Sequence, residues 1–311
     1  MMPSSIVRAS ENGRPFLPVG RGSIPSINDH WASDSNWNRD TIPDSQPDPE
    51  LFIRHALGDL ILSEYRSAGV DVSLSRRTPD GRVALYFLEP GAGGMAAQVT
   101  FDRLHTPFRD ISVTDLDWDR LLDTRVLFLT GITAALTEAT SAVVIEAARR
   151  ARAAGVTVAL DVNHRPALWT SNAAAATFAE LLPFVQTLFC SRRDAETVFG
   201  ITGDGPTIAR ELQVMSGAER VISTDGAHAV YWAAEEGAGS VPVAPVTVVD
   251  RPGAGDALVS GVLHGLLDGD LAEGLRVGVQ AASIALTHYG DLTRVSARDL
   301  AVSGGDTDIR R

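Results

Sequence analysis

The stretch that decides the fold is Asp250-Arg251-Pro252-Gly253-Ala254-Gly255-Asp256-Ala257-Leu258, which lies between two apolar segments. The β-branched run Val246–Val249 before it predicts a strand, and residues 254–267 predict a helix. The two glycines let the backbone turn tightly and approach a ligand closely. The first N–H groups of a helix have no acceptor within the helix, and with the helix dipole they favour an anion such as a phosphoryl group.

Asp256 falls in the first turn of this predicted helix and faces the same site. A carboxylate there can accept the proton of an attacking hydroxyl while the amide N–H groups stabilise the phosphate oxygens. The alternative is an ordinary helix start without chemistry, which is the commoner explanation for an isolated Gly-x-Gly-Asp. The flanking residues therefore decide between the two interpretations.

These flanks resemble the ribokinase-like (PfkB) carbohydrate kinases, whose signature is Asp-x-x-Gly-Ala-Gly-Asp followed by a helix rich in small residues. The resemblance covers about residues 55–303 of the chain. It implies an α/β fold, a three-layer α/β/α sandwich with a mainly parallel central sheet and a small β lid. It also implies that Gly253, Ala254 and Gly255 form the anion hole and that Asp256 is the catalytic base.

The remaining pattern also predicts an α/β fold, because short apolar strands alternate with helices through short connections. The predicted strands are 83–88, 98–101, 126–129, 156–160, 185–189, 221–223, 229–233 and 241–249. The predicted helices are 57–67, 137–154, 173–182, 193–199, 206–215, 254–267 and 271–288. The strands at 83–101 correspond to the lid.

A second run narrows the substrate: Asp161-Val162-Asn163-His164-Arg165-Pro166-Ala167-Leu168-Trp169. It follows the predicted strand 156–160, and α/β folds bind ligands at the carboxyl ends of strands. Within the family it resembles the 2-keto-3-deoxygluconate kinases, in which this arginine contacts the substrate. The planar guanidinium of Arg165 suits a sugar-acid carboxylate. A structural ion pair between Arg165 and an acid such as Asp161 is the alternative.

By the same resemblance, Tyr86, Arg103 and Asp291 match further substrate-side positions. Packing within the lid explains Tyr86 equally well. An aspartate after a glycine, as at Asp291, is also a common turn residue. The substrate role of these positions is therefore implied by the resemblance and not by the residue types alone.

The nucleotide side matches the family less well. Where the family often has Lys-x-Gly-x-x-Gly, this chain has Thr224-Asp225-Gly226-Ala227-His228-Ala229, and the family's Asn-x-x-Glu is Ser191-Arg192-Arg193-Asp194. The positions expected to bind the nucleotide are Thr224, Gly226, Ser191 and Asp194. The resemblance implies ATP and Mg²⁺ as cofactors and leaves room for a monovalent cation.

The first 50 residues differ from the rest, because they hold seven of the 16 prolines and no sustained apolar period. They also lack the apolar strand and the Gly-Gly-x-x-x-Asn segment with which these kinases normally begin. We expect a disordered or mis-translated segment at 1–50, a kinase domain at 51–305 and a flexible tail at 306–311. A frameshift or a misassigned start is the hypothesis that explains the first segment.

Composition excludes several classes of protein. The net charge of −12 argues against nucleic-acid and anionic-membrane partners. Cys190 is the only cysteine, so no intrachain disulfide can form, and a buried thiol is the preferred interpretation. No apolar stretch is long enough to span a membrane and no signal peptide is evident, so a cytoplasmic location is expected. The family resemblance adds dimerisation through the lid as an expectation.

The sequence thus predicts phosphoryl transfer from MgATP to a primary hydroxyl of 2-keto-3-deoxygluconate or a related sugar acid. One alternative is a kinase of this family for fructose, ribose or a deoxy-keto-inositol acid. Another is a catalytically impaired relic or binding module, because the N-terminal sugar-binding segment is missing. A Rossmann dehydrogenase is the least favoured, since the glycine motif lies near the C-terminus.

Overall fold

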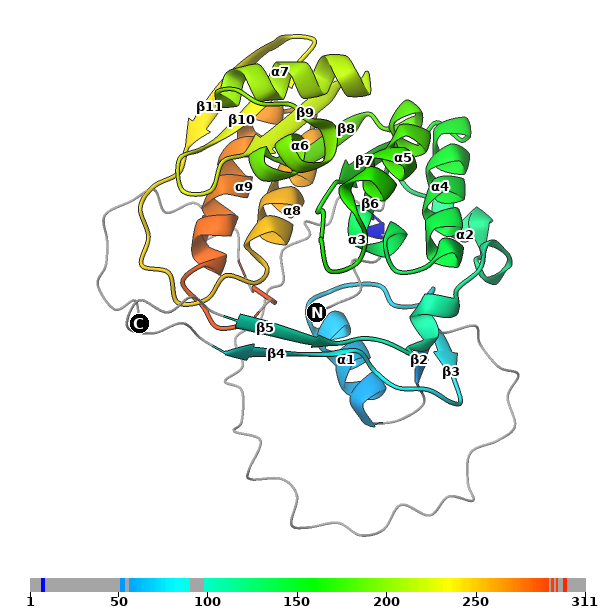
Figure 1. Cartoon of the computed structure of the whole chain (residues 1–311). Helices are drawn as coiled ribbons and strands as arrows, with labels where there is room; N and C mark the ends of the chain where they lie inside the picture. Colours follow the sequence, from blue (N-terminus) through cyan, green and yellow to red (C-terminus); the bar gives the residue numbers. More distant parts are fainter. Residues whose placement is uncertain are drawn as a thin grey trace.

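A seven-stranded sheet flanked by helices forms the body of the protein, as the computed structural model shows (Figure 1). The structure describes residues 7–8, 51–53, 56–89, 98–290, 292–293, 295 and 299–300. The strand order is β1-β6-β7-β8-β9-β10-β11. The predicted three-layer α/β/α class is confirmed.

Four parallel strands form the centre of this sheet, and antiparallel strands flank them on both sides. The parallel strands are β6 (Val126–Thr130), β7 (Thr157–Asp161), β8 (Thr187–Ser191) and β9 (Arg220–Thr224). The flanking strands are β1 (Val7–Arg8), β10 (Ala229–Ala234) and β11 (Gly237–Pro242). Register places Thr130 opposite Asp161 and Ser191 opposite Thr224, so these carboxyl ends share one edge.

Helices cover both faces of the sheet because side chains alternate along each strand. Leu127 and Leu129 pack toward one helical layer, whereas Val126 and Phe128 pack toward the other. The first layer contains α4 (Glu138–Ala153), α5 (Ser171–Leu181), α6 (Arg192–Phe199) and α7 (Gly205–Ser216). The second contains α8 (Ala254–Leu267) and α9 (Leu271–Ala285).

Glycines bring α8 and α9 into close contact. A Cβ added to Gly261 would lie 2.4 Å from the Cα of Gly278, and one added to Gly265 would lie 2.3 Å from the Cα of Gly274. The two helices therefore pack backbone to backbone at these positions. This contact fixes α8, the helix that the decisive motif begins.

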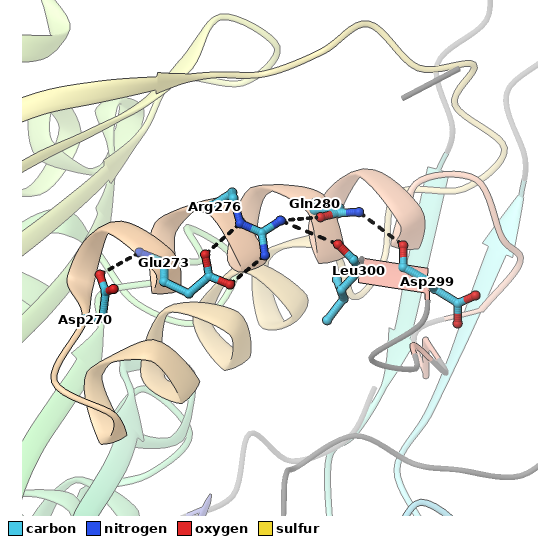
Figure 2. A network of polar contacts seen from close by, with 6 residues as sticks. All are labelled: Asp270, Glu273, Arg276, Gln280, Asp299 and Leu300. Carbon is cyan, nitrogen blue, oxygen red and sulfur yellow. Dashed lines mark hydrogen bonds and ion pairs between the residues drawn. The ribbon is translucent and has the colours of Figure 1, made fainter. Parts of the chain in front are cut away.

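The outer face of α9 carries a polar network (Figure 2). Arg276 pairs with Glu273 and donates to the carbonyl of Leu300 at 3.5 Å. Gln280 donates to the carbonyl of Asp299 at 3.1 Å. Asp270 caps the helix by accepting from the Glu273 amide at 2.9 Å. The network holds the last described residues against the helix that supports α8.

A small hairpin stands apart from the main sheet, near the end of the molecule where α8 begins (Figure 1). It consists of β4 (Leu85–Glu89) and β5 (Gln98–Asp102), paired antiparallel, with an ion pair between Arg82 and Asp102 at its base. Near it lie α1 (Ala56–Ser67), β2 (Leu51–Ile53) and β3 (Arg76–Thr78). The turns η1 (Pro107–Asp110) and η2 (Val113–Asp115) lead through α2 (Trp118–Leu122) into β6, and α3 (Gly131–Ala134) follows that strand.

Two sequence predictions need comment. The strand expected at 241–249 is wrong beyond Pro242, because residues 243–249 are described but form no strand. Pro245 has no N–H to donate, and Val249 donates instead to the carbonyl of Leu286 at 2.8 Å. Of residues 1–50, only Val7–Arg8 are described, paired antiparallel with β6, so the prediction for the remainder lies outside the described residues.

None of the helices within the described ranges is long and apolar enough to cross a bilayer. Cys190 is buried within β8, and burial raises the pKa of its thiol. It is therefore a core residue, in line with the preferred interpretation of the sequence.

Candidate active site

The turn before α8 has the backbone geometry that the glycines allow. Gly253 is the N-cap of α8 with φ +80°, a left-handed conformation that other residues rarely adopt. The first bond closing the helix runs from the amide of Ala257 to the carbonyl of Gly253 at 2.9 Å. The N–H groups of Ala254 and Gly255 consequently have no acceptor within the helix.

Space lies beside this first turn. A Cβ added to Gly255 would meet no atom within 4 Å, so packing does not require glycine there. Open space next to unsatisfied amides fits a phosphoryl group bound at a helix N-terminus. The residues present thus fit the phosphate end of a nucleotide.

Asp250 supports the turn from inside the protein. Its side chain is buried, accepting from the amide of Arg251 at 2.8 Å and from the amide of Gly290 at 3.1 Å. These two bonds tie the start of α8 to the segment that follows α9. Asp250 therefore acts as a brace for the backbone rather than as an exposed ligand.

Three carboxylates from three elements lie close together at the carboxyl edge of the sheet. Asp161 ends β7, and its pKa is raised to about 7 by burial first, and then by the negative charges of Asp256 and Asp194. Arg165 and a hydrogen bond from Asn163 partly oppose this shift. Asp256 is exposed on the first turn of α8. The predicted base thus lies next to the segment predicted to bind the substrate.

The turn after β7 is held by specific bonds. Asn163 has a positive φ of 39° and donates to the Asp161 carboxylate at 3.1 Å. The amide of His164 donates to the carboxylate of buried Asp194 at 3.2 Å. The amide of Val162 donates to the carbonyl of Phe189 at 2.9 Å. These contacts fix the backbone just before Arg165 and so the position from which its side chain extends.

Arg165 forms no ion pair within the described ranges, and its Nε is buried without a hydrogen-bond partner there. The structural salt bridge that was its alternative interpretation is therefore absent from this part of the chain. Leaving a buried donor unsatisfied costs about 1–3 kcal/mol, which a bound anion would offset.

Arg103 lies close to Arg165. Its guanidinium stacks on the ring of Phe101, 4.5 Å from the centroid. Burial lowers the pKa of Arg103, and the positive charges of Arg165 and Arg109 lower it further. The structure therefore brings together two arginines that the sequence predicted and a third, Arg109, that it did not.

The other predicted substrate residues have different outcomes. Tyr86, in β4, lies opposite Phe101 with ring centroids 6.3 Å apart, so it takes part in lid packing. This contact leaves its predicted substrate role open. Asp291 lies outside the described residues.

The predicted nucleotide residues gather at the edge formed by β8 and β9. Ser191 caps α6, accepting from the amide of Asp194 at 3.0 Å, and lies opposite Thr224 in the sheet. Gly226 occupies the following turn with a φ of +57° and no atom near an added Cβ. An ion pair of 2.9 Å between Arg192 and Asp225 joins the two segments.

Comparison with known proteins identifies the family. A model of the pfkB family carbohydrate kinases matches residues 55–298. The chain belongs to this family. It is accordingly a sugar kinase, and the predicted enzyme class is confirmed.

Relatives of this PfkB kinase include two with related names. A 2-dehydro-3-deoxygalactonokinase of Haloferax volcanii is 32% identical over 266 residues, covering 82% of this chain and 81% of the relative. The crystal structure of a 2-dehydro-3-deoxygluconokinase from Thermotoga maritima has a TM-score of 0.75 at 26% identity, with 81% of each chain covered. A putative ribokinase II from E. coli, solved with ATP and Mg²⁺, shares the fold at 19% identity with a TM-score of 0.69, covering 80% of this chain and 79% of that one.

Sequence reasoning assigned no role to three residues that lie at or near the candidate site. Asp250 belongs to the motif, but its role in supporting the turn could not be predicted, because the amide of Gly290 that it binds is 40 positions away in the sequence. Arg192 lies in a quoted motif, but its partner Asp225 is 33 positions away. Arg109 lies just beyond the lid, in a segment with no motif, so no local signal could have found it.

Metal binding has no preformed cluster in this part of the protein. Among the described residues, no group of three or more His, Cys, Asp or Glu side chains has the geometry to hold a metal ion.

Proposed function

We propose that this PfkB kinase transfers the γ-phosphoryl group of ATP to a primary hydroxyl of 2-keto-3-deoxygluconate or a close 2-keto-3-deoxy sugar acid. The observation that carries the proposal is that Asp256 and Arg165 both lie within electrostatic reach of Asp161, whose pKa both residues shift. A base and an unpaired guanidinium so close together suit a small substrate with a hydroxyl at one end and a carboxylate at the other.

Each residue has a defined task in this proposal. Asp256 accepts the proton of the attacking hydroxyl. The amides of Ala254 and Gly255 donate to the oxygens of the transferring group, where negative charge is greatest. Arg165 binds the carboxylate and orients the sugar so that its hydroxyl faces Asp256.

The nucleotide side rests on Ser191, Thr224 and Gly226, which would hold ATP along the edge of β8 and β9, with Asp194 near its phosphates. ATP with Mg²⁺ supplies the phosphoryl group and neutralises part of its charge. Backbone turns and hydroxyl groups suffice for this binding, so loss of the family's lysine does not exclude it.

The relatives support the sugar-acid class. The Haloferax and Thermotoga proteins are named for the 2-dehydro-3-deoxy acids of galactonate and gluconate respectively. We therefore expect the carboxylate and the 2-keto group to matter more than the configuration of one hydroxyl. Fructose, which lacks the carboxylate, is expected to be a poor substrate.

ADP release by the purified full chain tests the proposal, with MgATP and a panel of both 2-keto-3-deoxy acids, fructose, ribose and a deoxy-keto-inositol acid. Asp256→Asn serves as the blank for contaminating kinases. Turnover limited to the 2-keto-3-deoxy acids and lost in the variant supports the proposal. Turnover of neutral sugars alone would replace it with another PfkB specificity. Folded protein without turnover on any sugar would favour the binding-module alternative.

A further inference from the structure

Arg109 lies outside every motif of the family but close to the arginines of the site. It belongs to η1 (Pro107–Asp110), which follows the lid strand β5. The carbonyl of Arg109 accepts a hydrogen bond of 2.8 Å from Thr137 Oγ1, the N-cap of α4. The backbone of this turn is therefore fixed to the sandwich while its neighbour β5 belongs to the lid.

Three positive charges from separate segments meet here. Arg103 follows β5, Arg109 lies in η1 and Arg165 follows β7. The positive charges of Arg165 and Arg109 disfavour the charged form of Arg103, so Arg103 lies within electrostatic reach of both other guanidinium groups. Gathering like charges in a partly buried place is unfavourable unless an anion joins them.

Two of the three arginines, Arg109 and Arg165, differ from other arginines of the same region. Within the described ranges, the guanidinium groups of Arg109 and Arg165 have no ion pair or hydrogen bond. By contrast, Arg76, Arg77 and Arg82, which lie nearby in the sequence, each pair with an aspartate. Among the described residues, Arg109 and Arg165 are therefore free to bind an anion.

We propose that Arg109 is a further specificity-determining residue, which binds the carboxylate of the acceptor sugar acid together with Arg103 and Arg165. A carboxylate offers about four lone-pair sites, enough for donors from several guanidinium groups. The inference rests on the proposed sugar-acid kinase activity.

Steady-state kinetics of the full chain test this role. Arg109→Ala is expected to raise KM for the 2-keto-3-deoxy acid about tenfold to 100-fold, the range for a charge-assisted hydrogen bond. KM for ATP should stay within about twofold, because the nucleotide lies on the other side of the site. Arg109→Lys should recover part of the loss, since it keeps the charge without the planar fork.

Arg152→Ala is the matched control. Arg152 is exposed in the last turn of α4, and its replacement by alanine removes the same charge as Arg109→Ala does. The wild type should lose affinity for the acid more steeply with added salt than Arg109→Ala does. Thermal melting monitors folding, and Arg109→Gln replaces the alanine variant if that variant unfolds.

The outcomes separate this inference from the proposed function. Equal KM values for the acid in Arg109→Ala and Arg152→Ala, with the wild type active on that acid, overturn the role of Arg109 alone. A parallel rise of KM for ATP and for the acid would show a structural role and also overturn it. A wild type without turnover on any sugar acid would refute the proposed function itself.

Discussion

The two ends of the candidate site are built in different ways. At one end, a contiguous stretch from Asp250 to Asp256 carries backbone amides at the start of α8, which we propose as the anion hole. At the other, Arg103, Arg109 and Arg165 come from three segments and act through their side chains. The first end is local in the sequence and has the proposed role in phosphoryl transfer, whereas the second is assembled by the fold and has the proposed role of selecting the acceptor. We therefore expect substitutions at the first end to change the rate of phosphoryl transfer, and substitutions at the second end to change the choice of sugar.

Removal of the proposed general base should have the greatest effect on catalysis. Asp256→Asn should lower kcat by about 10²–10⁴-fold, the usual contribution of a general base. KM values for both substrates should change little, because the amide is isosteric. Since Asp256 is exposed, the melting temperature should be preserved. Initial rates and a thermal melt check this, and a variant with wild-type kcat would remove Asp256 from the mechanism.

The acid-binding end should respond in KM instead. Arg165→Ala is expected to raise KM for the sugar acid about tenfold to 100-fold while leaving KM for ATP nearly unchanged. Its buried Nε has no partner in the described structure, so loss of the side chain should not destabilise the fold. Kinetics on the acid and on fructose provide the measurement. If the KM for the sugar acid and the KM for fructose rise equally, Arg165 does not bind the carboxylate.

A third prediction concerns the close packing of α8, the helix that begins at the proposed anion hole, against α9. Gly261→Ala places a Cβ 2.4 Å from the Cα of Gly278, so α8 or α9 must shift. Overpacking of this kind costs about 1–3 kcal/mol. Ser260→Ala, on the exposed side of the same helix, is the control. Denaturant unfolding of both variants should show a loss of stability for Gly261→Ala only, and equal midpoints would contradict the close packing.

A more gradual effect, spread over several pH units, concerns Asp161, whose pKa is shifted by residues of both ends. Its pKa is raised to about 7 in the folded protein from an ordinary 3.8. Between these values the folded state holds a proton that the unfolded state has released, so stability should fall as pH rises from about 4 to 7. The slope is at most about 1.4 kcal/mol per pH unit and ends above pH 7.

Asp161→Asn should flatten this dependence, because the amide cannot ionise. Urea unfolding at several pH values between 4 and 8 compares the two proteins. An unchanged slope in the variant would mean that Asp161 does not carry the proton.

The family and the order of most strands and helices could be predicted from the sequence, and so could the turn at the start of α8 that we propose as the anion hole. The turn could be predicted because Gly253 and Gly255 act through backbone freedom, and Asp256 follows them directly in the same turn. The sequence also located Arg165 and Arg103 by resemblance. The strand expected at 241–249 failed because neighbouring prolines and a bond to Leu286 replace sheet pairing, a competition that local propensity does not reveal.

Only the tertiary structure decided which distant charges meet. The effect of Asp256 and Asp194 on Asp161 depends on β7 and β8 ending, and α8 beginning, close together. Arg109 lies within reach of Arg103 in a turn that Thr137 of α4 holds through a hydrogen bond. Electrostatic coupling depends on distance in space and on exclusion of water, neither of which is encoded in any short stretch of the chain.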